Sequence, residues 1–141
     1  MSSRPVPRND VTRVWALNYR LISSVIAEVV PAIQELGLEI KELFLLSELD
    51  EHPHPAALAD ALLIPKPSVT VYVKRLEAAG FVTREIDSSD LRRHRLTLTP
   101  DGRKALTRGL ALLTKAFGVR MSRLTSAEQD QFKTLLERLV S

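Results

Sequence analysis

The chain has 141 residues, of which 45% are hydrophobic, a net charge of +3 and no cysteine. This length and composition suit one domain with its own core, and the lack of thiols excludes disulfides, thiolate metal sites and cysteine redox chemistry. We expect a cytoplasmic protein, because we find no apolar run long enough to cross a bilayer and no signal-peptide core in the polar first ten residues.

The charge is unevenly distributed along the chain. Residues 66–123 carry a net charge of +8 and residues 31–65 a net charge of −6, while residues 1–30 and 124–141 carry +2 and −1. The position of charge bears more on the choice of partner than the total does. A polyanion is therefore the first partner to consider for the basic region.

The first predicted element is a long amphipathic helix over residues 11–37. Its apolar residues recur at three-to-four spacing on a face that is wider than one side of a small core requires. Pro31 should kink this helix or begin a separate last turn, and Gly37 suits its C-terminal cap. The broad face could serve the monomer core and a second subunit together.

Two shorter helices and an ambiguous segment come next. The helical period from Ile40 to Leu49 ends at a His-Pro-His-Pro turn, after which Pro55 fits the first position of a short helix. The segment SVTVYVKRLEAAG, residues 68–80, alternates in its first half as a strand would. Its Leu-Glu-Ala-Ala continuation and its final glycine favour a helix, with its buried side formed by Val69, Val73 and Leu76.

The remaining pattern predicts a hairpin and two helices. FVTREI and RLTLT alternate and flank the polar loop DSSDLRRHR, which is typical of a two-stranded hairpin. Thr99 and Pro100 should begin a long helix whose straightness Gly109 and Gly118 make less certain. A capping box, Thr125-x-x-Glu128, begins the last helix.

This order of elements predicts a winged helix-turn-helix, a mainly α fold with a small β-hairpin (α+β). Residues 56–79 supply the helix pair and residues 81–99 the wing. A helix fits the major groove of DNA, and a hairpin on the same face can reach the minor groove or the backbone. The fold therefore gives the basic region a specific candidate partner, double-stranded DNA.

The outward side of the second helix of this pair carries the candidate contacts. Ser68 and Thr70 can donate hydrogen bonds to phosphates or bases, and Val71 can contact only apolar groups such as a thymine methyl. Lys74 and Arg75 lie farther along and are assigned to backbone phosphates, and Lys66 lies at the start of the helix. The alternative is an ordinary solvated helix face, which the basic hairpin alongside makes the weaker interpretation.

Residues 58–106 resemble the DNA-binding core of MarR-type transcriptional regulators. The matching motifs are Leu58-Ala59, Ser68-Val69-Thr70, Leu76-Glu77, Gly80-Phe81-Val82, Asp90-x-Arg92-x-x-Arg95 and Leu98-Thr99-Pro100-x-Gly102. The wing motif joined to the Leu-Thr-x-x-Gly motif is the most selective part, and a weaker similarity covers nearly the whole chain.

The resemblance implies a homodimeric repressor on a pseudo-palindromic operator. One domain, 1–141, would comprise a DNA-binding lobe at 38–99 and dimerisation helices at 11–37 and 100–141. Asp90 would hold and orient Arg92, which would enter the minor groove from the wing tip, and a carboxylate two residues from a guanidinium at a turn can make that contact. Arg95 joins these wing contacts, and Arg93 would face phosphate or solvent.

Family members commonly respond to small aromatic or anionic ligands in a cleft between the dimerisation helices and the lobe. Five residues here could contribute to such a cleft: Trp15, Tyr19, Arg20, Leu43 and Phe44. An ordinary role in the core or on the surface is at least as well supported for each of them.

Three positions depart from the family pattern. Val71 stands where a polar base-reading residue is frequent, Leu63 and nearby prolines replace the usual glycine turn, and Leu91 occupies a wing position that is often arginine. Direct readout of bases should therefore depend less on hydrogen bonds, and the entry to the recognition helix should be stiffer.

Other functions have less support in the sequence. No catalytic triad order or phosphate-cradling glycine loop occurs, so neither an enzyme nor a cofactor is expected. His52 and His54 could bind a metal with Glu48 or Asp50, but we interpret them as turn residues and expect no metal site. The alternative to a DNA-binding regulator is a winged-helix protein-interaction module whose basic face binds an acidic protein surface.

Overall fold

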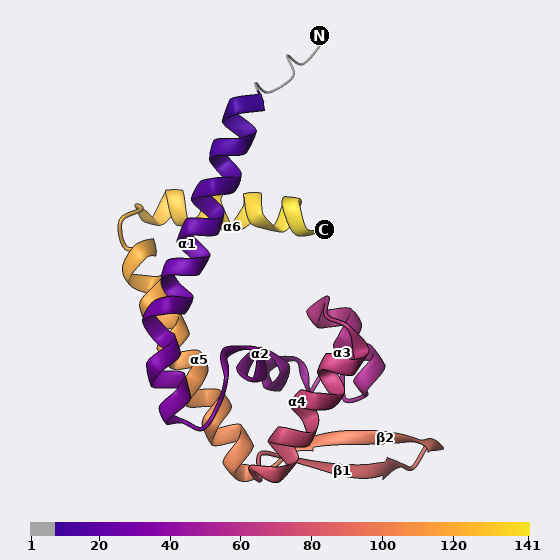
Figure 1. Ribbon diagram of the computed structural model, residues 1–141. Coiled ribbons are helices and arrows are strands. Elements are labelled where there is room, and N and C mark those ends of the chain that lie inside the picture. The colour runs from indigo at the N-terminus through magenta and orange to yellow at the C-terminus, as the bar shows by residue number, and fades with distance from the viewer. Residues whose placement is uncertain (1–7) are drawn as a thin grey trace. The chain divides into compact units, whose positions relative to one another are not determined.

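The structure is a computed structural model that describes residues 8–141, with side chains described for residues 10–90 and 93–141. The described chain forms six helices and two strands in the predicted order, so the expected fold class is confirmed (Figure 1). The elements are α1 (Arg8–Glu35), α2 (Ile40–Glu48), α3 (Pro55–Leu62), α4 (Lys66–Ala78), β1 (Val82–Asp87), β2 (Asp90–Leu98), α5 (Pro100–Met121) and α6 (Ser126–Val140).

The chain divides into two compact units. One, which we call the lobe, comprises residues 30–112; the other, the terminal unit, comprises the described residues up to 29 together with residues 113–141. The boundaries fall inside α1 and inside α5, so each of these helices contributes to both units.

The lobe has a continuous apolar core. Side chains from the end of α1, from α2, α3 and α4, and from both strands are buried there, among them Ile33, Leu43, Leu46, Leu58, Val69, Val73, Leu76, Val82 and Leu96. Burying one such side chain contributes about 1.5–3 kcal/mol. The ambiguous segment is a helix, as predicted, because its three apolar residues at helical spacing face this core.

Close packing explains two glycines of α5. A Cβ on Gly102 would overlap the carbonyl oxygen of Phe81, and a Cβ on Gly109 would lie 2.5 Å from Cδ1 of Leu43, which is fully buried. Gly109 is therefore a site of close approach as well as a helix-interior glycine.

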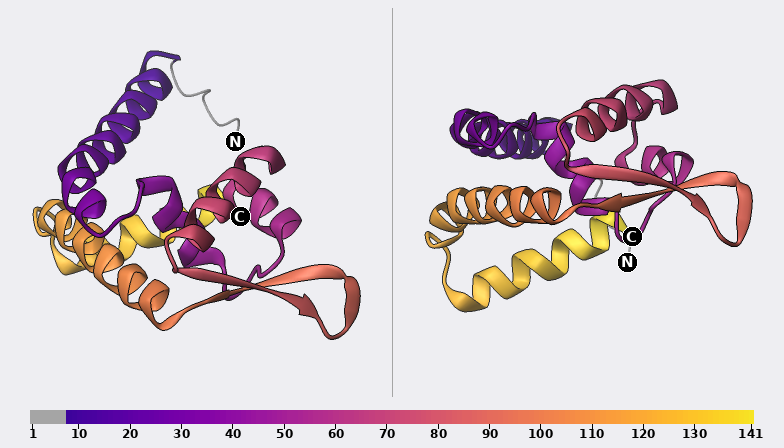
Figure 2. Two further views of the ribbon diagram at one scale, coloured as in Figure 1. Left: turned by 60° about the horizontal axis from the view of Figure 1, so that its bottom comes forward. Right: turned by 90° about the horizontal axis from the view of Figure 1, so that it is seen from below.

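The hairpin differs from the prediction in where its strands end. β2 begins at Asp90, so the expected nine-residue polar loop is reduced to Ser88 and Ser89. The strands pair antiparallel up to Ile86 with His94, and the next pair is Asp87 with Asp90, so residues 91–93 lie in an irregular stretch. Such a bulge bends and twists a strand locally. Two views show the hairpin tip extending beyond α3 and α4 (Figure 2).

α1 continues through Pro31 to Glu35, and Gly37 adopts φ +83, as suits a residue just past a helix end.

The expectation that no apolar run is long enough to cross a membrane was wrong. The stretch Asp10–Glu35 contains an 18-residue window that has the length and the apolar composition of such a span, with a mean hydropathy of 1.3. Only 17% of that window is buried. Arg13, Arg20 and Glu28 interrupt the apolar sequence of the helix as a whole, as is typical of an amphipathic helix that packs on other helices.

In the terminal unit, α6 begins at the predicted capping box. The backbone N–H of Glu128 donates to Oγ1 of Thr125 at 3.2 Å, and the backbone N–H of Thr125 donates to the Glu128 carboxylate at 2.9 Å. Arg120 of α5 pairs with Glu28 of α1 at 3.1 Å. No residue of α6 is buried.

Candidate nucleic-acid interface

α3 and α4 form the helix-turn-helix of the lobe. The chain bends by 114° between them, within the usual range for this motif. Leu63 makes the turn in the left-handed conformation, at φ 55 and ψ 42, with its side chain 90% exposed. Glycine adopts this conformation at lower cost, so the leucine carries local backbone strain.

The outward face of α4 is as predicted. Lys66, Thr70, Val71 and Lys74 are exposed and Ser68 is half-buried. Val71 is 58% exposed, which leaves an apolar contact point in the middle of this face.

Arg75 has partners that the sequence analysis did not foresee. Its guanidinium lies 2.6 Å from Oε1 of Glu39 and 3.5 Å from Oε1 of Glu42. The hydrogen bond from Glu39 and the charges of both carboxylates raise the pKa of Arg75. Glu42 is buried and also accepts the backbone N–H of Glu39, so Arg75 ties α4 to the start of α2.

The wing residues lie on a strand rather than on a loop. Arg93 and Arg95 are exposed on β2, and Asp90, also exposed, begins that strand. Arg92 follows two residues later, in the irregular stretch, and its side chain lies outside the described residues. The expected contact between Asp90 and Arg92 therefore stays a prediction.

A hydrogen-bonded network closes the base of the hairpin and gives the Leu-Thr-x-x-Gly motif a structural role. The hydroxyl of Thr99 donates to the carbonyl of Gly80 at 2.6 Å and accepts the N–H of Gly102 at 2.9 Å. The backbone N–H of Thr99 donates to the carbonyl of Phe81 at 3.1 Å. Thr99 thus caps α5 and joins the two strands.

His54 and Asp87 fasten the hairpin to α3, and the sequence analysis assigned neither residue to the interface. Nδ1 of His54 lies 3.0 Å from the carbonyl oxygen of His94, and Nε2 lies 3.2 Å from Oδ2 of Asp87. Both ring nitrogens face protein acceptors, so His54 is not available as a metal ligand. The buried Asp87 accepts the hydroxyl and the N–H of Ser89, and these bonds, with the nearby His54 and Arg93, lower its pKa.

A hollow of about 300 Å³ lies between the starts of α3 and α4 and the hairpin. Its lining consists of His54, Pro55, Ala56, Lys66, Arg84, Arg93 and His94. Arg84, which the sequence analysis did not single out, also pairs with Glu77 at 2.8 Å. Three permanently cationic side chains from α4, β1 and β2 meet here, an arrangement suited to an anion such as a backbone phosphate.

The residues expected to line a ligand cleft fall in different parts of the structure. Trp15, Tyr19 and Arg20 line a surface hollow of about 620 Å³ on α1, in the terminal unit. Leu43 is fully buried in the lobe core and Phe44 beside it is half-buried.

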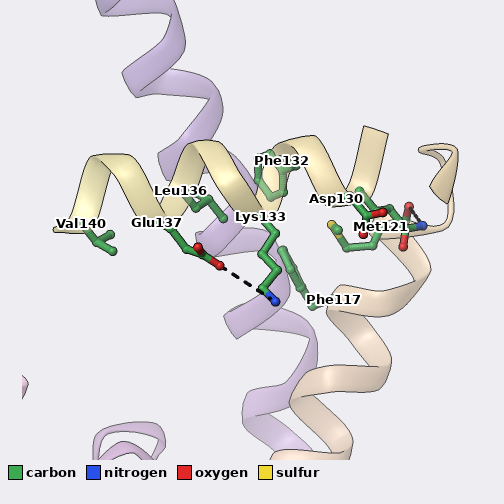
Figure 3. Close-up of a pocket in the computed structure, with 9 residues that line it drawn as sticks. Phe117, Met121, Asp130, Phe132, Lys133, Leu136, Glu137 and Val140 are labelled. Carbon is green, nitrogen blue, oxygen red and sulfur yellow. Dashed lines mark hydrogen bonds and ion pairs between the residues drawn. The ribbon is translucent and has the colours of Figure 1, made fainter. Parts of the chain in front are cut away.

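An apolar groove lies between α5 and α6 in the terminal unit (Figure 3). It has a volume of about 540 Å³, and its apolar lining consists of Phe117, Met121, Phe132, Leu136 and Val140. Lys133 and Glu137 also line the groove and form an ion pair at 3.9 Å across one turn of α6.

Comparison with known proteins identifies the family. A family model described as "MarR family" matches residues 36–93. The "HTH-type transcriptional repressor Rv2887" of Mycobacterium tuberculosis is 33% identical over 127 residues, which are 89% of this chain and 91% of that protein.

Two crystal structures of the Mycobacterium tuberculosis MarR family protein Rv2887 are also similar. The complex with DNA has a TM-score of 0.74 and 30% identity and covers 97% of this chain and 100% of that chain. The complex with p-aminosalicylic acid has a TM-score of 0.71 and 32% identity and covers 89% and 97%. The chain described here therefore belongs to the MarR family of winged helix-turn-helix transcriptional regulators, and not to an enzyme family.

Proposed function

We propose that this protein is a cytoplasmic, homodimeric repressor that binds a pseudo-palindromic operator in double-stranded DNA. The observation that carries the proposal is the cationic face of the lobe, which runs from Lys66 and Lys74 on α4 to Arg84, Arg93 and Arg95 on the hairpin. The DNA complex of the related Rv2887 protein supports it.

Each element has a separate task in this proposal. α4 enters the major groove, where Ser68 and Thr70 donate to bases or phosphates and Val71 contacts apolar base edges. Lys66 and Lys74 contact backbone phosphates, and the hairpin carries Arg92 into the adjacent minor groove, with Asp90 orienting it. Arg75 is assigned to holding α4 against α2, because two carboxylates already occupy its guanidinium.

The second copy of the chain is inferred from the terminal unit. Exposed apolar side chains lie along α1 and α6, including Trp15 at 70% exposure and Leu139 at 78%. Exposed apolar surface of this kind marks an interaction site, and a dimer would place one α4 in each half of a symmetric operator.

A small aromatic or anionic ligand is proposed to release the protein from DNA. The hollow on α1 offers an indole, a phenol and a guanidinium side by side, from Trp15, Tyr19 and Arg20, which suits an aromatic carboxylate. Rv2887 crystallised with p-aminosalicylic acid is a related protein in complex with such a compound.

The test begins with selection of bound duplexes from a random pool. We expect a palindromic site for which the binding constant falls steeply with salt, by roughly 0.9 log units per log unit of salt for each phosphate contacted.

Arg92→Ala should weaken operator binding strongly without changing the melting temperature. Arg123→Ala, which removes an exposed cation of the terminal unit, is the matched control. Binding to the selected site no tighter than to random duplex would instead favour the protein-interaction module.

A further inference from the structure

His54 occupies an unusual position between two hydrogen-bond acceptors of the hairpin. The side chain of His54 is 16% exposed, and that of Asp87, which it faces, is 9% exposed. One ring nitrogen lies 3.0 Å from a backbone carbonyl on β2, that of His94, and the other 3.2 Å from the Asp87 carboxylate on β1. Both partners belong to the hairpin, whereas His54 immediately precedes α3.

The protonation state of the ring decides how many of these contacts are hydrogen bonds. A backbone carbonyl can only accept, and an ionised carboxylate can only accept. Asp87 is held in its ionised form, because the hydroxyl and backbone N–H of Ser89 both donate to its other oxygen, at 2.7 and 2.9 Å. Neutral imidazole carries one N–H and can satisfy one acceptor, whereas imidazolium carries two and satisfies both.

We propose that His54 is a positioning residue for the DNA-binding hairpin, and that it holds the hairpin to α3 fully only as imidazolium. Operator affinity should then increase as the pH falls and His54 takes up its second proton. This inference rests on the proposed DNA-binding function, but the contact itself can be tested without DNA.

Charged groups from every neighbouring element lie around His54. Asp87 faces one ring nitrogen, whereas Lys66 from α4, Arg84 from β1 and Arg93 from β2 line the adjoining hollow, as does His94. A DNA phosphate in that hollow would offset these cations. Protonation and DNA binding would therefore promote each other, and by reciprocity the complex would take up a proton when it forms.

Two conservative variants separate the two contacts. The amide nitrogen of His54→Asn can replace Nδ1 and keep the bond to the carbonyl, and that of His54→Gln can replace Nε2 and keep the bond to Asp87. Neither amide titrates. His52→Asn is the matched control, because it removes another imidazole from the same turn, one that does not line the hollow.

The experiment measures operator affinity for these proteins between about pH 5.5 and about pH 8. We expect wild type and His52→Asn to bind roughly tenfold more tightly at the lower pH, the effect of one charge-assisted hydrogen bond, and both His54 variants to lose most of that difference. A His54 variant that keeps the wild-type pH dependence would overturn the proposal.

A measurement on the free protein separates failure of this inference from failure of the proposed function. Imidazole ¹⁵N NMR should show both nitrogens of His54 protonated and hydrogen-bonded at low pH. The amide of Leu96, which donates to the carbonyl of Pro53 at 2.8 Å, should exchange more slowly there than in His54→Gln. If both results are observed but the protein does not bind DNA, the proposed function is wrong and the His54 contact stands. If the protein binds its operator but one ring nitrogen of His54 makes no hydrogen bond at low pH, the inference about His54 is wrong and the proposed function stands.

Discussion

α4 and α6 are both amphipathic helices, but within the described residues α4 buries its apolar side chains and α6 leaves its own exposed or half-buried. α4 buries Val69, Val73 and Leu76 in the lobe, whereas no residue of α6 is buried and Leu139 remains 78% exposed. The lobe thus has an apolar core of its own, while the terminal unit leaves more of its apolar side chains exposed. The difference is the reason for proposing a second copy of the chain at the terminal unit.

The largest expected effect tests that second copy. Leu139→Glu should raise the dimer dissociation constant by roughly 100-fold or more, because an unpaired charge would enter an apolar interface. Sedimentation across a concentration series measures it. Thr134→Glu adds the same charge on the opposite side of α6 and should leave the dimer intact. If both variants dimerise as wild type does, α6 is not part of the interface.

A pair of glycines in α5 tests the contrast in packing. Gly102→Ala should cost about 2 kcal/mol or more, because its Cβ would overlap the Phe81 carbonyl at the base of the hairpin. Gly118→Ala, in the terminal unit, meets nothing within 4 Å and should stabilise the protein by about 0.5–1 kcal/mol. Denaturant unfolding measures both. Equal effects of the same sign would contradict the difference in packing.

Two adjacent cations on α4, Lys74 and Arg75, test whether a charge of the lobe pairs with carboxylates of the chain or with DNA phosphates. Lys74→Ala should reduce the salt dependence of operator binding by about 0.9 log units per log unit of salt, as loss of one phosphate contact does. Arg75→Ala should weaken binding with an unchanged slope, because Arg75 acts through Glu39 and Glu42. A reduced slope for Arg75→Ala would return that residue to the set of phosphate contacts.

The smallest expected effect lies in the turn between α3 and α4. Leu63→Gly should raise stability by up to about 1 kcal/mol, because leucine at φ 55 is strained and its exposed side chain contributes little burial. A rise of a few degrees in the melting temperature would confirm it. Leu17→Gly, at a half-exposed position inside α1, should lower the melting temperature instead, which controls for the substitution itself.

Local patterns were sufficient to predict most of the fold. Helical spacing placed Val69, Val73 and Leu76 inward, and the Thr125 capping box marked the start of α6, because both signals depend on residues close together in the chain. Pro31 did not end its helix, since helical packing on either side outweighs one lost hydrogen bond. The polar hairpin residues paired into strands where their composition suggested a loop.

The candidate site was less predictable because its contacts join residues far apart in the sequence. Arg75 meets Glu39 across 36 positions and His54 meets the carbonyl of His94 across 40. Contacts between residues so far apart in the sequence leave no local pattern that predicts them, so Arg75 was assigned to phosphate and His54 to a turn. The outward face of α4 was predictable because helical periodicity alone sets it.

The contact between Pro53 and Leu96 has a consequence for solubility. β2 is one edge of a two-stranded sheet, and the N–H of Leu96 on it donates to the carbonyl of Pro53. Proline has no N–H of its own to offer in return, so the ladder cannot be extended past this turn. At that point the β2 edge gives no template on which another copy could add a strand.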